Sequence, residues 1–500
     1  MHFMEKILAL TFQIRDFMWG NWMVALLVLT GIVLTVVTKM VQVRRLGNAL
    51  RLVFLGARGK DHTVEDEGDI SPFAALMTAL AATVGNGNIA GVATAIATGG
   101  PGAPLWMWIS GFFGMATKYA EGFLGVKFRK MAEDGTMAGG PMYYIRYGLK
   151  EGKFSKFLAA AFAICGAFAA LFGTGNMAQS NSMALAFKTQ FGVPPLLSGA
   201  LLTLLVGLVI LGGIKRIGAV AEKLVPGMIL FYFLGALTVI LVNITHLLEA
   251  FEIIIASAFT PRAFGGALIG TSVQKALSLG VSRGVLSNES GLGSAAIAQS
   301  ASKSSDPTKN GLIAMTGTFI DTIVVNTMTT LTIVLSGMWL FTPALGVDLN
   351  PANVAIQNLP HQVVDYAAKV GYNLQAGGLS STALTSAAFN TVIPYGFGGA
   401  IIAIASFLFG YTTLIGWAYY GEQCLEYIAG VRIKKPYRLI YIALLFLGAN
   451  LQGQYLDIVW NVGDTANALM AFPNLIGLLL LAGLVARITQ KAFKDGKRVY

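Results

Sequence analysis

Long runs of apolar residues, separated by short polar connections, follow one another along almost the whole chain. A helix needs about 20 mostly apolar residues to cross the hydrocarbon core of a bilayer. Runs of that length predict eleven membrane-spanning helices and therefore an all-α polytopic membrane protein. The predicted spans are residues 21–42, 72–99, 103–127, 157–178, 195–213, 225–245, 265–298, 311–340, 390–421, 438–455 and 466–488.

Composition supports this class and excludes others. Hydrophobic residues make up 55% of the 500 residues and charged residues only 12%, about half the charge content of a soluble protein. Secreted, nucleic-acid-binding and cytosolic enzyme classes are thereby excluded. The two cysteines lie far apart in apolar runs, which predicts neither a disulfide framework nor a metal site. No known nucleophile or zinc motif is present, and the four histidines lie outside the predicted spans, so we expect no enzyme.

The positions of the basic residues predict the topology. Of the 35 Lys and Arg residues, 27 fall in connections that lie on one side of the predicted bundle. These connections are residues 39–71, 127–156, 214–224, 298–310, 431–438 and 486–500. Because cytoplasmic loops are enriched in Lys and Arg, this distribution places the N-terminus outside and the C-terminus in the cytoplasm. The net charge of +11 then follows from topology and needs no nucleic-acid partner.

Two predicted spans are interrupted by glycines and polar residues. The second contains TVGNGNIAG (residues 83–91), and the seventh contains SNESGLGSAA (residues 287–296). Each glycine lowers helix propensity by about 1 kcal/mol relative to alanine, and Asn and Ser compete for backbone hydrogen bonds. Paired interruptions in two halves of a membrane protein point to a transporter binding site, where unwound backbone lines a cavity. The alternative is that the glycines only let helices pack closely.

The order of the spans predicts an internal repeat. Without the first span, five spans begin at residue 72 and five begin at residue 265, from opposite sides of the membrane. This arrangement is a five-plus-five inverted repeat with one extra N-terminal helix. The predicted divisions are residues 1–71 (an interfacial helix, the extra helix and a cytoplasmic loop), 72–245 (first repeat), 246–264 (an external amphipathic connection), 265–488 (second repeat) and 489–500 (a cytoplasmic tail).

Four segments of the chain have a distinctive sequence: residues 78–121, SRGVLSNESGLGSAAIA (282–298), FIDTIVVNTMT (319–329) and LIGWAYYGEQCLEY (414–427). These segments resemble the alanine or glycine:cation symporter family, that is, the sodium:alanine symporters. The resemblance extends along the chain from about residue 20. It implies a leucine-transporter-like fold and sodium-coupled uptake of a small neutral amino acid across a bacterial inner membrane. Sodium would be a transported ion and not a prosthetic group.

An amino acid substrate needs partners for both of its charges. The N-terminus of a half-helix suits a carboxylate, which we assign to the backbone amides of Asn86, Gly87 and Asn88. The ammonium group should meet oxygens of the second interruption. The residues expected there are Asn288, Ser290 and Gly291, with Gln179 as a contact from a third helix and Trp417 as an apolar wall. For Trp417 the alternative is an ordinary packing role.

The resemblance also implies a sodium site. It places the ion between the carbonyls of Ala81 and Val84 and the hydroxyls of Thr412 and Thr413. The alternative for the two threonines is that they only bond back to carbonyls of their own helix. Charged residues inside a membrane indicate function by default, so a network or gate is expected near the second interruption. Its members are Arg283, Glu289 and Asp321.

Departures from the family pattern leave the preferred substrate open. The family commonly has Thr or Ser at the position of Asn86, Phe at Leu286, Ala at Ser290 and often Cys at Asn326. A second hypothesis is therefore a proton-coupled amino acid transporter or an exchanger on the same fold. Asp321 and Glu289 are the side chains that could carry the protons.

Overall fold

The computed structural model describes residues 2–59, 67–173, 175–259, 263–264, 267–268, 273–342 and 379–494, and nearly all regular structure in them is helical. The elements up to the middle of the chain are α1 (His2–Met18), α2 (Asn21–Val37), α3 (Val41–Arg44), α4 (Leu46–Ala57), α5 (Pro72–Thr83), the π-helical turn η1 (Gly87–Gly91), α6 (Val92–Gly99), α7 (Ala103–Lys127), β1 (Lys130–Met131), β2 (Met137–Ala138), α8 (Pro141–Gly148), α9 (Lys153–Phe172), α10 (Met177–Phe191), α11 (Pro195–Ile210) and α12 (Gly213–Val242).

The later elements are η2 (Ile244–His246), α13 (Leu247–Phe259), β3 (Ala263–Phe264), β4 (Ala267–Leu268), α14 (Val273–Asn288), α15 (Ser294–Ser300), α16 (Pro307–Thr318), the π-helical turn η3 (Phe319–Val325), α17 (Asn326–Leu335), η4 (Met338–Phe341), α20 (Ser381–Asn390), α21 (Phe397–Ala429), η5 (Val431–Ile433), α22 (Lys434–Asn450) and α23 (Gln454–Lys494). The strands form two short antiparallel hairpins, β1–β2 and β3–β4. Lys130 pairs with Ala138 in the first hairpin, and Ala263 pairs with Leu268 in the second.

Several helices are long and apolar enough to cross a bilayer. Among the described residues there are six such runs, or seven if the bent pair α5 and η1–α6 is one span. The six are Met4–Val37, Lys153–Phe191, Gly213–Val242, Pro307–Leu335, Phe397–Ala429 and Gln454–Lys494. The predicted all-helical, multi-span membrane protein is thereby confirmed. The count of eleven spans stays a prediction, because α11, for example, is apolar but only 16 residues long.

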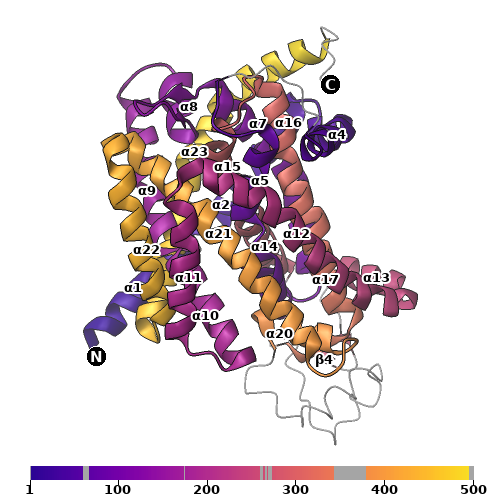
Figure 1. The fold of residues 1–500 in the computed structure, drawn as a ribbon. Coiled ribbons are helices and arrows are strands. Elements are labelled where there is room, and N and C mark those ends of the chain that lie inside the picture. Colours follow the sequence, from indigo (N-terminus) through magenta and orange to yellow (C-terminus); the bar gives the residue numbers. More distant parts are fainter. Residues whose placement is uncertain are drawn as a thin grey trace, which may run out of the picture.

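The ends of the helical bundle carry different parts of the chain. Figure 1 shows α1 with the N-terminus at one end, and α4, α8 and the end of α23 at the other. The short helices α13 and α20 lie at the end that carries α1. The predicted connection 246–264 contains α13, and its residues 260–262 lie outside the described part of the chain.

Helix α7 packs between segments that come much later in the sequence, namely α14, α15 and α16. Glycines permit this close approach. A Cβ added at Gly122 would lie 2.5 Å from the Cβ of Ala314, and one added at Gly125 would lie 2.6 Å from the carbonyl oxygen of Ala296. Small residues at such contacts let membrane helices approach closely. As a result, α7 lies directly against the second interruption.

Candidate functional site

The first interruption separates α5 from α6 at the position the glycines predict. Helix α5 ends at Thr83, and the chain bends by 49° before it continues through η1. Gly85 lies so close to α21 that a Cβ there would be 2.6 Å from Thr413 Oγ1. The amide of Gly85 donates to Asn88 Oδ1 at 2.8 Å, which caps the unwound turn. Glycine at position 85 therefore brings the break into contact with a hydroxyl of another helix.

The second interruption separates α14 from α15. Three of its residues have a positive φ angle: Glu289 (56°), Gly291 (96°) and Gly293 (82°). Glycine adopts this conformation without strain, whereas an L-residue such as Glu289 loses roughly 1–2 kcal/mol. Backbone strain of this kind is concentrated at functional sites, so the carboxyl side chain at position 289 is a candidate functional group.

A carboxylate from α7 holds the second interruption in place. Glu121 Oε1 accepts hydrogen bonds from the amides of Gly291 and Gly293, each at 3.0 Å, and from Asn474 Nδ2 at 2.9 Å. The site lies at the N-terminus of α15, where the helix dipole favours a negative charge. The sequence alone does not show this role of Glu121, because Gly291, Gly293 and Asn474 lie at least 170 residues further along the chain.

A cavity of about 210 Å3 lies between the two interruptions. Seven predicted residues line it: Asn86, Gly87, Gln179, Arg283, Glu289, Thr413 and Trp417. It also borders Ser381, an exposed residue of α20, so the cavity reaches the surface of the molecule. The sequence did not single out Ser406 on α21 or Trp460 and Asp464 on α23, which line the cavity as well. Helix periodicity alone does not show which helix they face.

Several polar atoms around this cavity have no partner within the described part of the chain. They are Asn86 Oδ1, Gln179 Nε2 and Ser406 Oγ, and all three are shielded from solvent. Buried polar atoms are normally hydrogen-bonded, and leaving one unsatisfied costs about 1–3 kcal/mol. An acceptor on Asn86 and a donor on Gln179 are complementary to an ammonium and to a carboxylate. The cavity therefore suits a small molecule with both charges.

Other predicted residues lie behind the cavity wall in a polar network that joins the two interruptions. Asp321 on η3 accepts from Asn88 Nδ2 at 2.6 Å, from Thr322 Oγ1 at 2.8 Å and from Ser287 Oγ at 3.1 Å. Asn88 Nδ2 also donates to Asn326 Oδ1 at 2.9 Å. We name Asn88, Ser287, Asp321, Thr322 and Asn326 the polar hub. All five residues are buried, and only Ser287 borders the cavity. The hydrogen bonds of the polar hub fix the two interruptions relative to each other.

The remaining predicted substrate residues also have partners in the protein. The amide of Asn88 donates to the carbonyl of Gly85 at 3.1 Å. Asn288 Nδ2 donates to Thr322 Oγ1 at 2.9 Å, and Ser290 Oγ lies 2.8 Å from Thr318 Oγ1. Gly291 contacts Glu121, as described above. None of these residues borders the cavity. The second interruption contacts the cavity through Ser287 and Glu289 instead.

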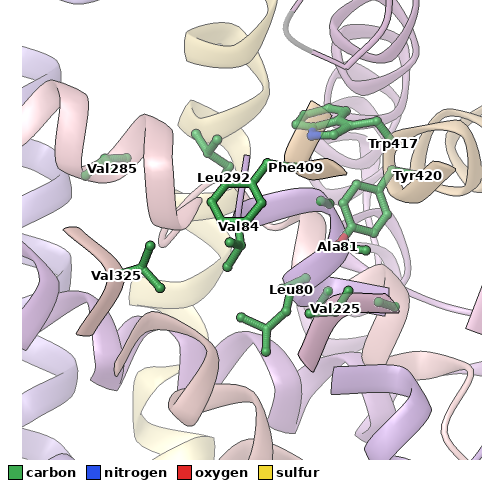
Figure 2. Close-up of a cluster of buried hydrophobic side chains, with 14 of the residues drawn as sticks. Leu80, Ala81, Val84, Val225, Val285, Leu292, Val325, Phe409, Trp417 and Tyr420 are labelled. Atoms are coloured by element: carbon green, nitrogen blue, oxygen red, sulfur yellow. The ribbon is translucent and has the colours of Figure 1, made fainter. Parts of the chain in front are cut away.

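The predicted sodium ligands lie where α5 meets α21. Figure 2 shows Ala81 of α5 and Val84, the residue that follows α5, in one apolar cluster with Phe409 and Trp417 of α21. Thr412 and Thr413 each donate to the carbonyl of Phe409, at 3.0 and 2.9 Å. Both hydroxyls keep oxygen lone pairs, and hard cations prefer oxygen ligands. Of the two threonines, only Thr413 borders the cavity.

Glu289 and Trp417 connect the cavity wall to the second interruption. The indole Nε1 of Trp417 donates to Glu289 Oε1 at 2.8 Å, and Ser294 Oγ donates to the other carboxylate oxygen. Trp417 is 2% exposed, and an added Cβ at Gly175 would lie 2.9 Å from its ring. Its position is thus fixed by packing on one side and by a hydrogen bond on the other.

Ion pairs gather at the end of the bundle that carries the basic connections. Lys434 lies 2.7 Å from Asp134 and 3.2 Å from Glu426, and Arg438 lies 2.5 Å from Glu422. Burial raises the pKa of Asp134, but hydrogen bonds from Lys434 and Thr136 outweigh it and lower this pKa below its usual value. These pairs join the connection after α7 to α21 and α22.

The chain matches a family model along nearly its whole length. The model, described as the sodium:alanine symporter family, covers residues 2–499. The chain belongs to this family. The resemblance stated from the four segments is thereby confirmed, and the protein is a transporter and not an enzyme. Family membership makes sodium a transported ion and not a prosthetic group.

Curated relatives support the same assignment. The transporter is 46% identical over 487 residues to the sodium/alanine symporter AgcS of Methanococcus maripaludis, covering 97% of each chain. It is 32% identical over 457 residues to a sodium/proton-dependent alanine carrier protein of a Bacillus species, covering 90% of this chain and 93% of the relative.

Proposed function

We propose that this transporter imports a small neutral amino acid, alanine or glycine, together with sodium by alternating access. The observation that carries the proposal is the cavity at the first interruption. At about 210 Å3 it is smaller than the roughly 300–1,000 Å3 of pockets for larger ligands. Its unpartnered side-chain amides supply an acceptor on Asn86 and a donor on Gln179 in the lining of the cavity. The names of the two relatives support sodium and alanine.

The substrate would lie between the two interruptions. Gln179 Nε2 and the amides at Asn86 and Gly87 are donors for the carboxylate, and Asn86 Oδ1 is an acceptor for the ammonium group. Trp417 forms an apolar wall. Four further residues stabilise the two interruptions through hydrogen bonds of their side chains or amides and do not contact the substrate directly. They are Asn88, Asn288, Ser290 and Gly291.

The proposed sodium site comprises the carbonyls of Ala81 and Val84 and the hydroxyls of Thr412 and Thr413. Support comes from the contact between Gly85 and Thr413, which places a hydroxyl at the end of α5, where carbonyls are no longer used by the helix. Arg283, Glu289 and Asp321 form the charged network around the second interruption.

The proposal includes the arrangement in the membrane. We propose eleven membrane-spanning helices in a leucine-transporter-like fold, with repeats at residues 72–245 and 265–488. The extra helix lies in residues 1–71, residues 246–264 form the external connection, and residues 489–500 form the cytoplasmic tail. The N-terminus lies outside a bacterial inner membrane and the C-terminus in the cytoplasm. The opposite placement of α1 and the end of α23 agrees with an odd number of spans (Figure 1).

Uptake of labelled alanine into proteoliposomes tests the function. We expect accumulation under an inward sodium gradient and none when choline replaces sodium at constant pH. Thr413→Ala should raise the sodium concentration that half-saturates uptake, because it removes one oxygen ligand. Uptake that persists in choline, or that follows a pH gradient alone, would contradict sodium coupling and favour the proton-driven or exchange alternative.

A further inference from the structure

The chain turns sharply where it leaves α2, at the end of the bundle that carries the end of α23. Lys39 and Met40 have positive φ angles of 56° and 54°, which L-residues adopt only at a cost in free energy. Beyond this turn α3 begins, and α4 then packs on the edge of the bundle against α16 and α5 (Figure 1). The inner faces of α3 and α4 bury Val41, Ala49 and Leu52. The opposite face of the two helices is exposed.

This exposed face combines large apolar side chains with basic ones. The apolar members are Val43 (56% exposed), Leu50 (37%) and Phe54 (54%). The basic members recur every seven residues and are all exposed: Arg44, Arg51 and Arg58. Such a combination is typical of a helix that lies in the interface between a bilayer and water.

The last turns of α23 extend the basic surface. Gln490 Nε2 donates to the carbonyl of Val37 at the end of α2, at 3.1 Å, and the guanidinium of Arg45 lies 4.4 Å from the ring centre of Phe493. Three exposed cations follow one side of α23 there: Arg487, Lys491 and Lys494. We name the six exposed cations of the two segments the basic platform, that is, Arg44, Arg51, Arg58, Arg487, Lys491 and Lys494.

The charge of the basic platform is not balanced by its neighbours. Residues 39–59 and 487–494 contain no acidic residue. Within the described part of the chain, none of the six cations forms an ion pair. Acidic residues follow in the connection to α5. Of these, Asp69 directs its carboxylate to the amide of Met137 at 2.8 Å, and Asp61, Glu65 and Asp66 lie outside the described residues.

We propose that the basic platform binds the headgroups of anionic phospholipids in the cytoplasmic leaflet, while Val43, Leu50 and Phe54 insert between the lipids. The proposal rests on the proposed arrangement in the membrane, which places this end of the bundle in the cytoplasm. Four to eight Lys and Arg directly after a membrane helix or on an amphipathic helix suit an anionic lipid surface, and each contributes about fivefold to the affinity.

Bound lipid would hold the start of the first interrupted helix. A Cβ added at Gly56 of α4 would lie 3.0 Å from the Cβ of Phe73, in the first turn of α5. Because α4 lies so close to α5, a lipid that fixes α4 at the interface also restricts the movement of α5. The platform therefore connects the composition of the leaflet to the helix that carries the proposed sodium ligands.

The test measures which lipid lies beside α4. A bimane fluorophore is attached to Leu50→Cys in the full-length transporter, whose own cysteines are replaced (Cys165→Ala and Cys424→Ala), and size-exclusion chromatography checks that each protein is folded. In phosphatidylcholine nanodiscs, half-maximal quenching should require at least about tenfold less nitroxide-labelled phosphatidylglycerol than nitroxide-labelled phosphatidylcholine. The difference should be lost in 1 M salt, where the Debye length falls to about 3 Å.

Two triple variants with the same change in net charge make the test specific. Replacement of Arg44, Arg51 and Arg58 by Gln should abolish the preference for phosphatidylglycerol. The matched control replaces three exposed cations before and at the start of α9 by Gln, namely Lys150, Lys153 and Lys156, and should retain the preference.

Three results would overturn the proposal. The first is equal quenching by the two lipids in the unchanged platform, and the second is equal loss of the preference in both triple variants. The third is a preference that arises only after Asp61→Asn, Glu65→Gln and Asp66→Asn, which would show that the acidic connection covers the platform. Quenching requires no transport and nanodiscs expose both leaflets, so a failure of the proposed uptake or of the topology is detected separately, by uptake and by external thiol labelling.

Discussion

Substitution of Gly85 by alanine should raise the sodium concentration that half-saturates uptake. The new Cβ would lie 2.6 Å from Thr413 Oγ1, well inside the roughly 3.5 Å at which non-bonded atoms make their best contact. The hydroxyl must therefore withdraw or turn to its other rotamer, which is available to threonine in a helix. Either movement takes a proposed sodium ligand away from the end of α5.

The size of the effect follows from what the hydroxyl contributes. A polar contact to a charged group is worth roughly 1.5–3 kcal/mol, and each 1.4 kcal/mol is a factor of ten. Half-saturating sodium should thus rise roughly 10- to 150-fold, while the affinity for alanine at saturating sodium changes less. Uptake of labelled alanine at a series of sodium concentrations measures both quantities.

Two further variants make this test specific. In Thr413→Ala the clashing oxygen is absent, and the remaining Cβ is 3.8 Å from the new methyl group, an ordinary contact. Gly85→Ala should therefore add little in that background, because neighbouring substitutions that act through one group are not additive. Gly317→Ala is the matched control, with its nearest neighbour, Leu76, 3.7 Å away. Equal effects of Gly85→Ala with and without Thr413 would refute the reasoning.

Three other predictions concern selectivity, topology and stability. Alanine and glycine should compete for uptake, whereas leucine and phenylalanine should not. Asn86→Thr should change the ratio of alanine uptake to glycine uptake. Competition by leucine as strong as that by glycine would contradict a small cavity. An external thiol reagent should label a cysteine placed at Glu249 but not one placed at Glu151 in sealed cells, and the reverse would contradict the topology. Lys434→Gln should lower the melting temperature in detergent at pH 7, because it removes the partner of Asp134. Since the pKa of Asp134 in the folded protein lies below 3.8, this stabilisation is present above that value and is lost as the pH falls through the lowered pKa, so the two proteins should then converge.

The interruptions could be predicted from sequence because their cause is local. Glycine and asparagine at residues 85–88 and glycine at residues 291 and 293 weaken the helix at their own positions, and the structure ends α5 at Thr83 and α14 at Asn288. The apolar runs predicted spans for the same reason. Length alone misjudged some limits, since α14 begins at Val273 and not at residue 265.

The partners of the interruptions could not be predicted in this way. In the sequence, Glu121 lies three residues after Lys118, which predicts an ion pair within one helix. In the structure, the carboxylate of Glu121 accepts hydrogen bonds from the amides of Gly291 and Gly293. The sequence predicts a substrate contact for the backbone amide of Asn88, but it does not indicate that the side chain of Asn88 belongs to the polar hub. Each assignment depends on a contact between helices far apart along the chain, which periodicity and propensity do not encode.

The polar hub has a consequence for the synthesis and membrane insertion of the protein. Asn88 and Asp321 are separated by 233 residues. At the roughly 5–20 residues per second of synthesis, the ribosome needs on the order of 10–50 s to reach Asp321 after Asn88. During that interval the amide of Asn88 has entered the bilayer without its final acceptor, which is costly in hydrocarbon. The first interrupted helix can therefore reach its final structure only after Asp321 has been synthesised. Chains truncated before Asp321 should be degraded by membrane proteases and should not accumulate as half-transporters.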